Sequence, residues 1–439
     1  MSVFKACDVR GVYPDDLDED LVRDIGRALG AEIDGGTCVV GGDVRPSTPS
    51  LKNSVAAGLV ASGVHVTDVG IAPTPALHWA REHLGTDAVV IVTASHNPAE
   101  YNGVKFALGP RPPTPEVVEE LQQRMQNGDF VSGEGSIRTQ PIRPDYLQWL
   151  AGTFEGCANG LRVLVDAGNG SASRWAPDAL RTAGCEVEEL FCNPDGTFPN
   201  RSPNPAVPEA LEETGRVVAG RNVDFAVAFD GDADRAVFVD GHGNYMESDE
   251  AVILLARDAL RREPGSAVIY DQKCSERVGE EIRKAGGRPI RERSGYAFIK
   301  NRLLEEEAAF AGEASGHFFF REMGGDDAIY AALRMAKLIR DSGRSLAQLR
   351  ETVPDRHITP DIRLPRPQGD AQAVIEHLKK RFSNRPQDYI DGVRVRFENG
   401  WALCRESVTE PVITIRVEGD TPEAMERLRE LVLGEIEKV

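Results

Sequence analysis

The sequence predicts an α/β protein in which three similar α/β domains precede a smaller α+β domain. Its 439 residues are enough for about three domains of ordinary size, or slightly more. An apolar strand, a polar turn, a helix, a glycine and a second strand recur three times at domain-sized intervals. The end of the chain alternates apolar and charged residues instead, which is typical of antiparallel strands with one face in water.

Each of the three copies opens and closes with a short strand rich in β-branched residues. The opening and closing strands are expected at Thr37–Val40 and Val64–Val69, at Leu161–Val165 and Val187–Phe191, and at Ala267–Tyr270 and Pro289–Arg291. The helices between them are expected near Ser50–Ala61 and ending near Ala183 and Ala285. Short apolar strands that alternate with helices favour buried and mostly parallel pairing.

Composition shifts suggest where the domains meet. A stretch rich in Gly, Ser and Pro at Asn127–Pro144 is typical of a linker, and a Pro-rich segment at Pro354–Pro367 precedes the last unit. The predicted domains are residues 1–143, 144–246, 247–357 and 358–439. The fourth is expected to have strands at Tyr389–Phe397, Trp401–Leu403 and Val412–Val417, and helices at Ala371–Phe382 and Pro422–Val439.

Charge and composition exclude several classes of function. The formal net charge of −19 repels a polyanion such as DNA, so we expect no nucleic-acid partner. An anionic substrate would need basic groups gathered in a cleft. No apolar run approaches the roughly 20 residues that cross a bilayer, and the first residues lack a secretory pattern. The seven cysteines form no CxxC pair, which favours reduced thiols and a cytoplasmic protein without membrane partners.

The first of four loops that could carry chemistry follows the apolar strand Val89–Val92. It reads Thr-Ala-Ser-His-Asn-Pro at 93–98, and Lys105 lies close by in sequence. The strand delivers Ser95 to its carboxyl end, where α/β folds bind their ligands. Ser95 could therefore be a nucleophile or a carrier of phosphate, although an ordinary polar turn gives the same pattern.

The second loop carries carboxylates at every second position between two apolar strands. Asp230, Asp232 and Asp234 would repel one another by about 1 kcal/mol or more per close pair without a cation. Oxygen ligands at this density suit Mg²⁺. An EF-hand does not fit, because its sixth position would be Arg235 instead of glycine and its twelfth Gly241 instead of glutamate. A solvated acidic hairpin remains the alternative.

The third and fourth loops are weaker signals when taken alone. In Gly-Glu-Ala-Ser-Gly-His at 312–317, Glu313 could accept hydrogen bonds from two sugar hydroxyls, and His317 could act as an acid or a base. A structural histidine beside Phe318 would look the same. In Arg-Glu-Ser-Val-Thr-Glu-Pro at 405–411, an arginine and two hydroxyls could cradle phosphate, or form an ordinary polar hairpin.

Taken together and in this order, the four loops resemble those of the α-D-phosphohexomutase family, of the phosphomannomutase/phosphoglucomutase type. Supporting motifs are Asp-Val-Arg-Gly at 8–11, Gly-Asp-Val-Arg at 42–45, Asp-Gly-Thr-Phe-Pro-Asn at 195–200 and Asp-Gln-Lys at 271–273. The resemblance implies mixed sheets in the three α/β domains, which with the α+β domain surround a central cleft. It also implies a phosphohexomutase that interconverts hexose 1-phosphate and hexose 6-phosphate through a 1,6-bisphosphate intermediate.

The same resemblance assigns roles to individual residues. Ser95 is expected as a phosphoserine, and one Mg²⁺ per chain is expected on the carboxylates of 230–234 and that phosphate. Hexose 1,6-bisphosphate is the expected activator. Further expected roles are sugar binding for Glu313 and Ser315, distal-phosphate binding for Arg405, Ser407 and Thr409, positive charge from Arg10, Lys105, Arg235 and Lys273, and proton transfer by Lys105 or His317.

Three departures from the family pattern bear on the substrate. Cys7 stands where an aromatic residue is common, Ser294-Gly295-Tyr296 replaces Thr-Gly-His, and Val408 stands where Asn or Gly is common. We expect mannose or glucose phosphates as substrates and a monomer or homodimer. The alternatives are a phosphoglucosamine mutase, a hexose-phosphate phosphatase or phosphotransferase that uses the same serine, and a silent sugar-phosphate binding protein.

Overall fold

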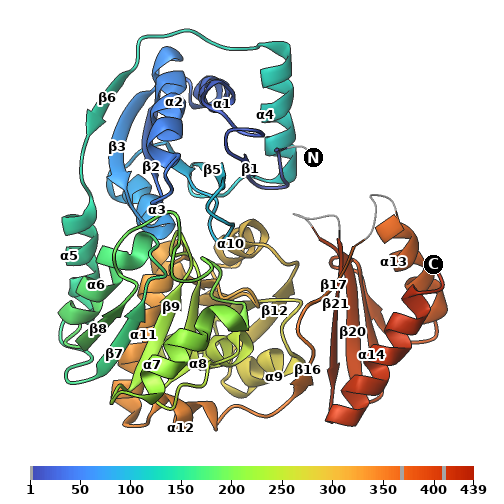
Figure 1. Ribbon diagram of the computed structural model, residues 1–439. Coiled ribbons are helices and arrows are strands. Elements are labelled where there is room, and N and C mark those ends of the chain that lie inside the picture. The colour runs from blue at the N-terminus through green and yellow to red at the C-terminus, as the bar shows by residue number, and fades with distance from the viewer. Residues whose placement is uncertain (1–2, 366–369, 408–411) are drawn as a thin grey trace.

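The computed structural model describes residues 3–365, 370–407 and 412–439. They form four sheets in succession along the chain, each with its own helices. In Figure 1 the first unit lies above the second and third, and the fourth lies beside the third. Mixed sheets in the first three units and an antiparallel sheet in the fourth confirm the predicted fold class.

The first unit is a six-stranded sheet covered on both faces. Its elements are β1 (Val9–Val12), α1 (Glu19–Ile33), β2 (Thr37–Gly42), α2 (Thr48–Ala61), β3 (His65–Ile71), α3 (Thr74–His83), β4 (Ala88–Val92), β5 (Tyr101–Leu108), α4 (Pro115–Asn127) and β6 (Ser136–Thr139). The strand order is β1-β5-β4-β2-β3-β6, and only β5 runs antiparallel to its neighbours. Alternating side chains fill both faces: Val40 packs in the cluster under α1 and α2, and Val39 in the cluster under α3.

The second unit is smaller and has four strands in the order β10-β9-β7-β8. Its elements are α5 (Arg143–Phe154), β7 (Arg162–Asp166), a 3₁₀ turn (Ser171–Arg174), α6 (Ala176–Thr182), β8 (Glu186–Leu190), a second 3₁₀ turn (Pro208–Leu211), α7 (Glu212–Ala219), β9 (Phe225–Phe229) and β10 (Ala236–Asp240). Strands β7, β8 and β9 are parallel, and β10 returns antiparallel to β9.

The stretch predicted as a linker, Asn127–Pro144, also contributes to the fold. It supplies β6, which pairs in parallel with β3 at the edge of the first sheet, and α5 begins within it at Arg143. All four residues of β6 are exposed. Backbone pairing with β3 holds the strand, together with side-chain hydrogen bonds from Arg138 to Thr67 and between Ser136 and His65. Such a strand leaves no apolar pattern in the sequence.

The third unit has five strands in the order β12-β11-β13-β14-β15. Its elements are α8 (Ser248–Arg262), β11 (Ala267–Asp271), α9 (Glu276–Lys284), β12 (Arg288–Glu292), α10 (Tyr296–Glu305), β13 (Phe310–Gly312), β14 (Phe318–Phe320), a 3₁₀ turn (Arg321–Met323), β15 (Gly325–Asp326), α11 (Ala328–Ser342) and α12 (Leu346–Arg350). One continuous apolar cluster, which runs from Val39 to Val353, joins the first three units.

The fourth unit has an apolar cluster of its own, between its sheet and two helices. Its elements are β16 (His357–Ile358), β17 (Ile362–Pro365), α13 (Asp370–Arg381), β18 (Gln387–Asp388), β19 (Val393–Phe397), β20 (Gly400–Glu406), β21 (Val412–Gly419) and α14 (Pro422–Ile436). It meets the third unit through charged contacts, such as Arg394 and Arg396 on Glu276. This contact is therefore polar, whereas the first three units share a core.

One local design recurs in the first three units. A strand that is parallel to its inner neighbour is followed by an antiparallel strand, in the pairs β4–β5, β9–β10 and β13–β14. The turn of each pair carries one of the predicted loops, at 93–98, 230–235 and 312–317. The sheet topology therefore presents all three loops at strand ends.

A buried contact between the second and third units predicts a pH-dependent stability. Asp327 caps α11 and accepts a hydrogen bond from the Tyr146 hydroxyl of α5, and burial raises the pKa of its carboxyl to about 7. Because the folded pKa is raised, the stabilising contribution is lost as pH rises from about 4 to about 7. The quantity to compare is the free energy of unfolding of the wild type minus that of Asp327→Asn. This difference should fall by about 1–3 kcal/mol between pH 5 and pH 8. Chemical denaturation at both pH values measures this difference, and a constant difference would contradict the assignment.

Candidate functional site

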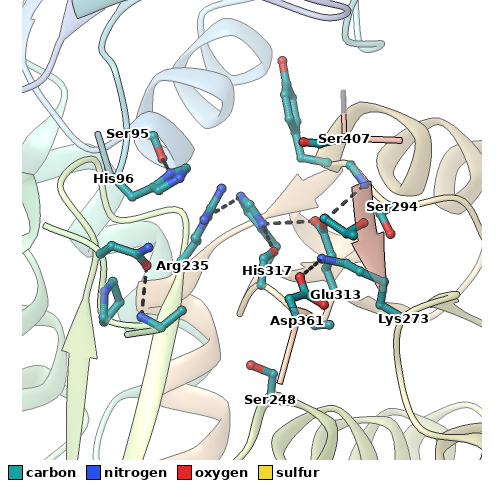
Figure 2. A pocket seen from close by; sticks show the side chains of 18 of the residues that line it. Ser95, His96, Arg235, Ser248, Lys273, Ser294, Glu313, His317, Asp361 and Ser407 are labelled. Carbon is teal, nitrogen blue, oxygen red and sulfur yellow. Dashed lines mark hydrogen bonds and ion pairs between the residues drawn. The ribbon is translucent and has the colours of Figure 1, made fainter. Parts of the chain in front are cut away.

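A cavity of about 530 Å³ opens between the four units and gathers the predicted residues. Figure 2 shows several of them facing the same space from different strands and loops. The predicted residues that line it are Arg10, Ser95, Lys105, Arg235, Lys273, Glu313, Ser315, His317, Arg405 and Ser407. The three aspartates of 230–234 are buried beneath this group. Thr409 lies outside the residues that the structure describes.

Ser95 is held in an unusual backbone conformation at the end of β4. Its φ angle is 51°, in the left-handed region that residues other than glycine seldom adopt. Its Oγ donates to Asp230 Oδ2 at 3.0 Å and lies 3.3 Å from His96 Nδ1. Strain at a residue whose side chain reaches another domain is typical of a functional position.

Arg45 stabilises the backbone conformation of the Ser95 loop. Its guanidinium is fully buried and donates to the backbone oxygens of Ser95, at 2.9 Å, and of Asn97, at 2.6 Å. It also bonds the carbonyl oxygens of Pro98 and Tyr101, and it pairs with Asp43 at 3.0 Å. A buried, fully bonded arginine therefore holds the loop as one rigid piece.

The three aspartates lie almost completely inside the protein. At least one oxygen of each lies within 4.8 Å of those of the others. Asp230 Oδ1 accepts from the backbone nitrogens of Asp234 and Arg235, which fixes the turn. Burial, followed by the charges of Asp234 and Asp232, raises the pKa of Asp230 well above its usual range. Such a cluster is stable only with positive charge nearby.

Lys105 supplies part of that charge. Its Nζ donates to Asp232 Oδ2 at 2.9 Å and to Asp234 Oδ2 at 2.7 Å. Burial alone would lower the pKa of Lys105, but Asp232 and Asp234 outweigh it and raise the pKa. In the described part of the chain, Asp232 Oδ1 is buried without a hydrogen-bond partner. An unpartnered carboxylate oxygen beside Asp230 and Asp234 fits a divalent cation with oxygen ligands.

His317 joins the loop of the third unit to the aspartates of the second. Its Nε2 lies 3.3 Å from Asp234 Oδ1, and its Nδ1 lies 3.1 Å from Glu313 Oε2 and 2.9 Å from Ser315 Oγ. Burial lowers the pKa of the ring, but Asp234 outweighs it and the pKa rises to about 10. The backbones of Arg235 and His317 also form an antiparallel bridge, so the two loops lie side by side.

The remaining cations come from three different units. Arg10 on β1 pairs with Asp8 at 2.7 Å and donates to Asn97 at 2.8 Å. Lys273, after β11, pairs at 2.9 Å with Asp361 of the fourth unit, as Figure 2 shows. Arg405 is the penultimate residue of β20 and pairs with Asp391. Its Nη2 is buried without a hydrogen-bond partner among the described residues, so it can still receive an anion.

Several residues at the site escaped the sequence analysis as individuals. His96 touches the serine, Asp326 lies 3.8 Å from His317, and Asp361 holds Lys273. Arg45 belonged to a motif quoted there, but without a role. The position of Arg45, two residues after Asp43 in the turn after β2, could have indicated a buried ion pair. Asp326 and Asp361 have no such local signal, because only tertiary packing brings them to the site.

The domains and the full chain match known proteins. Sequence models of phosphoglucomutase/phosphomannomutase match in order: α/β/α domain I at residues 1–132, α/β/α domain II at 146–243, α/β/α domain III at 247–357 and the C-terminal domain at 362–435. The chain is 37% identical to the phosphomannomutase/phosphoglucomutase of Pseudomonas aeruginosa over 445 residues, which covers 100% of this chain and 96% of that protein.

The chain belongs to the phosphoglucomutase/phosphomannomutase family. It is also 35% identical to a phosphoglucomutase of Neisseria gonorrhoeae, over 97% of this chain and 95% of that one. The crystal structure of a phosphoglucomutase/phosphomannomutase family protein from Burkholderia thailandensis superposes with a TM-score of 0.92. That protein is 34% identical, and the match covers 99% of this chain and 98% of that one. The predicted family is thereby confirmed.

Replacing the buried arginine tests its hold on the serine loop. Arg45→Lys leaves several buried carbonyl oxygens unpaired and should lower the free energy of unfolding by about 1–3 kcal/mol. Misplacement of Ser95 should also lower hexose phosphate turnover, by about 10–100-fold. Melting temperature and steady-state kinetics measure the two effects. The matched control is Arg427→Lys, an exposed residue of α14, which should change neither. Wild-type turnover in Arg45→Lys would refute the role.

Proposed function

We propose that this protein is a phosphohexomutase that interconverts the 1-phosphates and 6-phosphates of mannose or glucose, with Ser95 as the phosphoryl carrier. Membership of the family and the full-length identity support hexose phosphate mutase activity. The observation that carries the assignment of Ser95 is its 3.0 Å contact with Asp230, which joins a hydroxyl of the first unit to a buried carboxylate cluster of the second.

Mg²⁺ fits the residues that surround Ser95. Asp230, Asp232 and Asp234 would hold it together with an oxygen of the phosphate on Ser95. The closeness of the three carboxylates and the unpartnered oxygen of Asp232 support this assignment. The bound cation supplies positive charge that withdraws electron density from the transferring phosphoryl group. The nearby Lys105 and Arg235 would bind phosphate oxygens once the cation is in place.

The walls of the cavity suit a sugar with phosphate at either end. Glu313 and Ser315 would bind two hydroxyls of the ring, whichever way the sugar faces. The cations toward the fourth unit, together with Thr409, would hold the phosphate that is not transferred. The cations are Arg405, with its unpartnered nitrogen, and Lys273, and the hydroxyl of Ser407 lies with them. Arg10 would add positive charge on the side of the first unit.

In the proposed reaction, Ser95 carries one phosphoryl group and exchanges it with either end of the hexose. The phosphoryl group on Ser95 Oγ passes to the free hydroxyl of a hexose monophosphate, which loses its proton as the O–P bond forms. The resulting 1,6-bisphosphate turns around, and its other phosphoryl group returns to Ser95. Protonated Lys105 or His317 would give a proton to Ser95 Oγ as the bond from Oγ to phosphorus breaks, and would take up the proton of the sugar hydroxyl in return. The raised pKa values of both side chains favour this protonated starting form.

The proposal also covers the activator, the partners and the location of the protein. Hexose 1,6-bisphosphate would prime an unphosphorylated enzyme, and sugar phosphates would be the only partners, in a cytoplasmic monomer or homodimer. In the described part of the chain every helix is too short or too polar to cross a bilayer. The net charge of −19 continues to favour a protein without nucleic acid.

A coupled assay with purified protein and a trace of hexose 1,6-bisphosphate tests the proposed function. Mannose 1-phosphate, glucose 1-phosphate and glucosamine 6-phosphate should be compared. Turnover of the first two is the expected result. Preference for the amino sugar would favour a phosphoglucosamine mutase, release of inorganic phosphate a phosphatase, and binding without turnover a silent binding protein.

The carrier role predicts a severe and specific loss in Ser95→Ala. Without the hydroxyl no phosphoenzyme forms, so mutase turnover should fall by about 1,000-fold or more, while hexose phosphate binding measured by calorimetry is retained. Ser50→Ala on α2, whose hydroxyl bonds Glu19 away from the cavity, is the matched control. Turnover in Ser95→Ala near that of Ser50→Ala would refute the assignment.

The metal assignment predicts a defect in binding that needs no substrate. Asp232→Asn removes one charge and should weaken the affinity for Mg²⁺ by about 10-fold or more. Titration of the apoprotein by calorimetry measures this directly. Asp178→Asn, on the surface of the same unit, should bind Mg²⁺ like the wild type. Equal affinities in both variants would count against the site.

A further inference from the structure

Tyr296 crosses the cavity from the third unit to the first. It is the first residue of α10, and it packs against the apolar cluster of that unit that contains Ile299 and Leu303. At the other end, its hydroxyl donates to the backbone oxygen of Cys7 at 3.3 Å. Both residues line the cavity. The side chain therefore connects two units across the site.

The Tyr296 ring also lies beside both residues placed for proton transfer. Lys105 Nζ is 5.6 Å from the ring centroid, which is within the range of a cation–π interaction. The His317 ring is 6.5 Å away with an interplanar angle of 28°, a stacked arrangement at the long end of aromatic pairs. One rigid side chain thus contacts a lysine of the first unit and a histidine of the third.

We propose that Tyr296 is a positioning residue, which ties the segment around Cys7 to the third unit and thereby fixes Lys105 relative to His317. This inference rests on the proposed mutase function and adds a residue to it. Lys105 already contacts Asp232 and Asp234, and the ring supports it on a further side. Small errors in the placement of such groups are costly for transfer reactions, because reacting atoms need near-contact geometry.

Two substitutions separate the hydroxyl tie from the ring. Tyr296→Phe keeps the ring and should lower kcat by about 3–10-fold, whereas Tyr296→Leu removes both features and should lower kcat by about 30-fold or more. KM for the hexose phosphate should change less than kcat in both. Tyr389→Phe in the fourth unit, an exposed tyrosine bonded to Gln387, is the matched control and should leave both constants unchanged.

Hydrogen exchange tests the tie independently of activity. In Tyr296→Phe, peptides that contain residues 5–8 should exchange their amide hydrogens faster than in the wild type, while α10 is unchanged. Faster exchange in a protein without mutase activity would overturn the proposed function but keep the tie. Unchanged exchange, or wild-type kcat in folded Tyr296→Leu while the native protein is an active mutase, would overturn the positioning role.

Discussion

The site depends on the burial of three carboxylates in one turn. Asp230, Asp232 and Asp234 are nearly inaccessible to water, so their mutual repulsion must be balanced by groups that the rest of the fold brings in. Lys105 comes from the first unit and His317 from the third. The charge balance of a single hairpin thus requires three units to meet at one point, and the shared apolar cluster keeps them there.

The same electrostatics explain how an acidic protein can accept phosphate esters. The chain carries a net charge of −19, yet its cavity is lined by lysines and arginines from all four units. Several of these cations are paired with carboxylates in the structure, as Lys273 is with Asp361. The phosphate of the substrate would compete with those carboxylates for the cations. The fourth unit is joined to the third by charged contacts instead of a common core, so a shift of the fourth unit would expose less apolar surface than a shift among the first three.

Much of this arrangement could be predicted from the sequence because the signals are local. The spacing of the three aspartates, the strand before Ser95 and the order of four loops each depend on a few consecutive residues. The four-domain fold and the family were predicted on that basis and are confirmed. The domain limits and the role of each site residue stay predictions, and Thr409 lies outside the described residues.

What the sequence could not supply are the contacts between segments far apart in the chain. Ser95 and Asp230 are 135 positions apart, and Tyr296 reaches Cys7 across 289. No periodicity encodes such pairs. The edge strand β6 was missed for a different reason, because all four of its residues are exposed and give no apolar pattern. The hydrogen bonds of Arg45 could not be predicted, because their acceptors are backbone oxygens, which have no sequence signature.

The most direct measurement of the central claim is transfer of a labelled phosphoryl group. Protein incubated with hexose 1,6-bisphosphate labelled in its phosphates should acquire label on Ser95, located by peptide mass spectrometry. Unlabelled mannose 1-phosphate or glucose 1-phosphate should then remove the label and return it in a hexose bisphosphate. Label on another residue, no label at all, or release of the label only as inorganic phosphate would contradict the account.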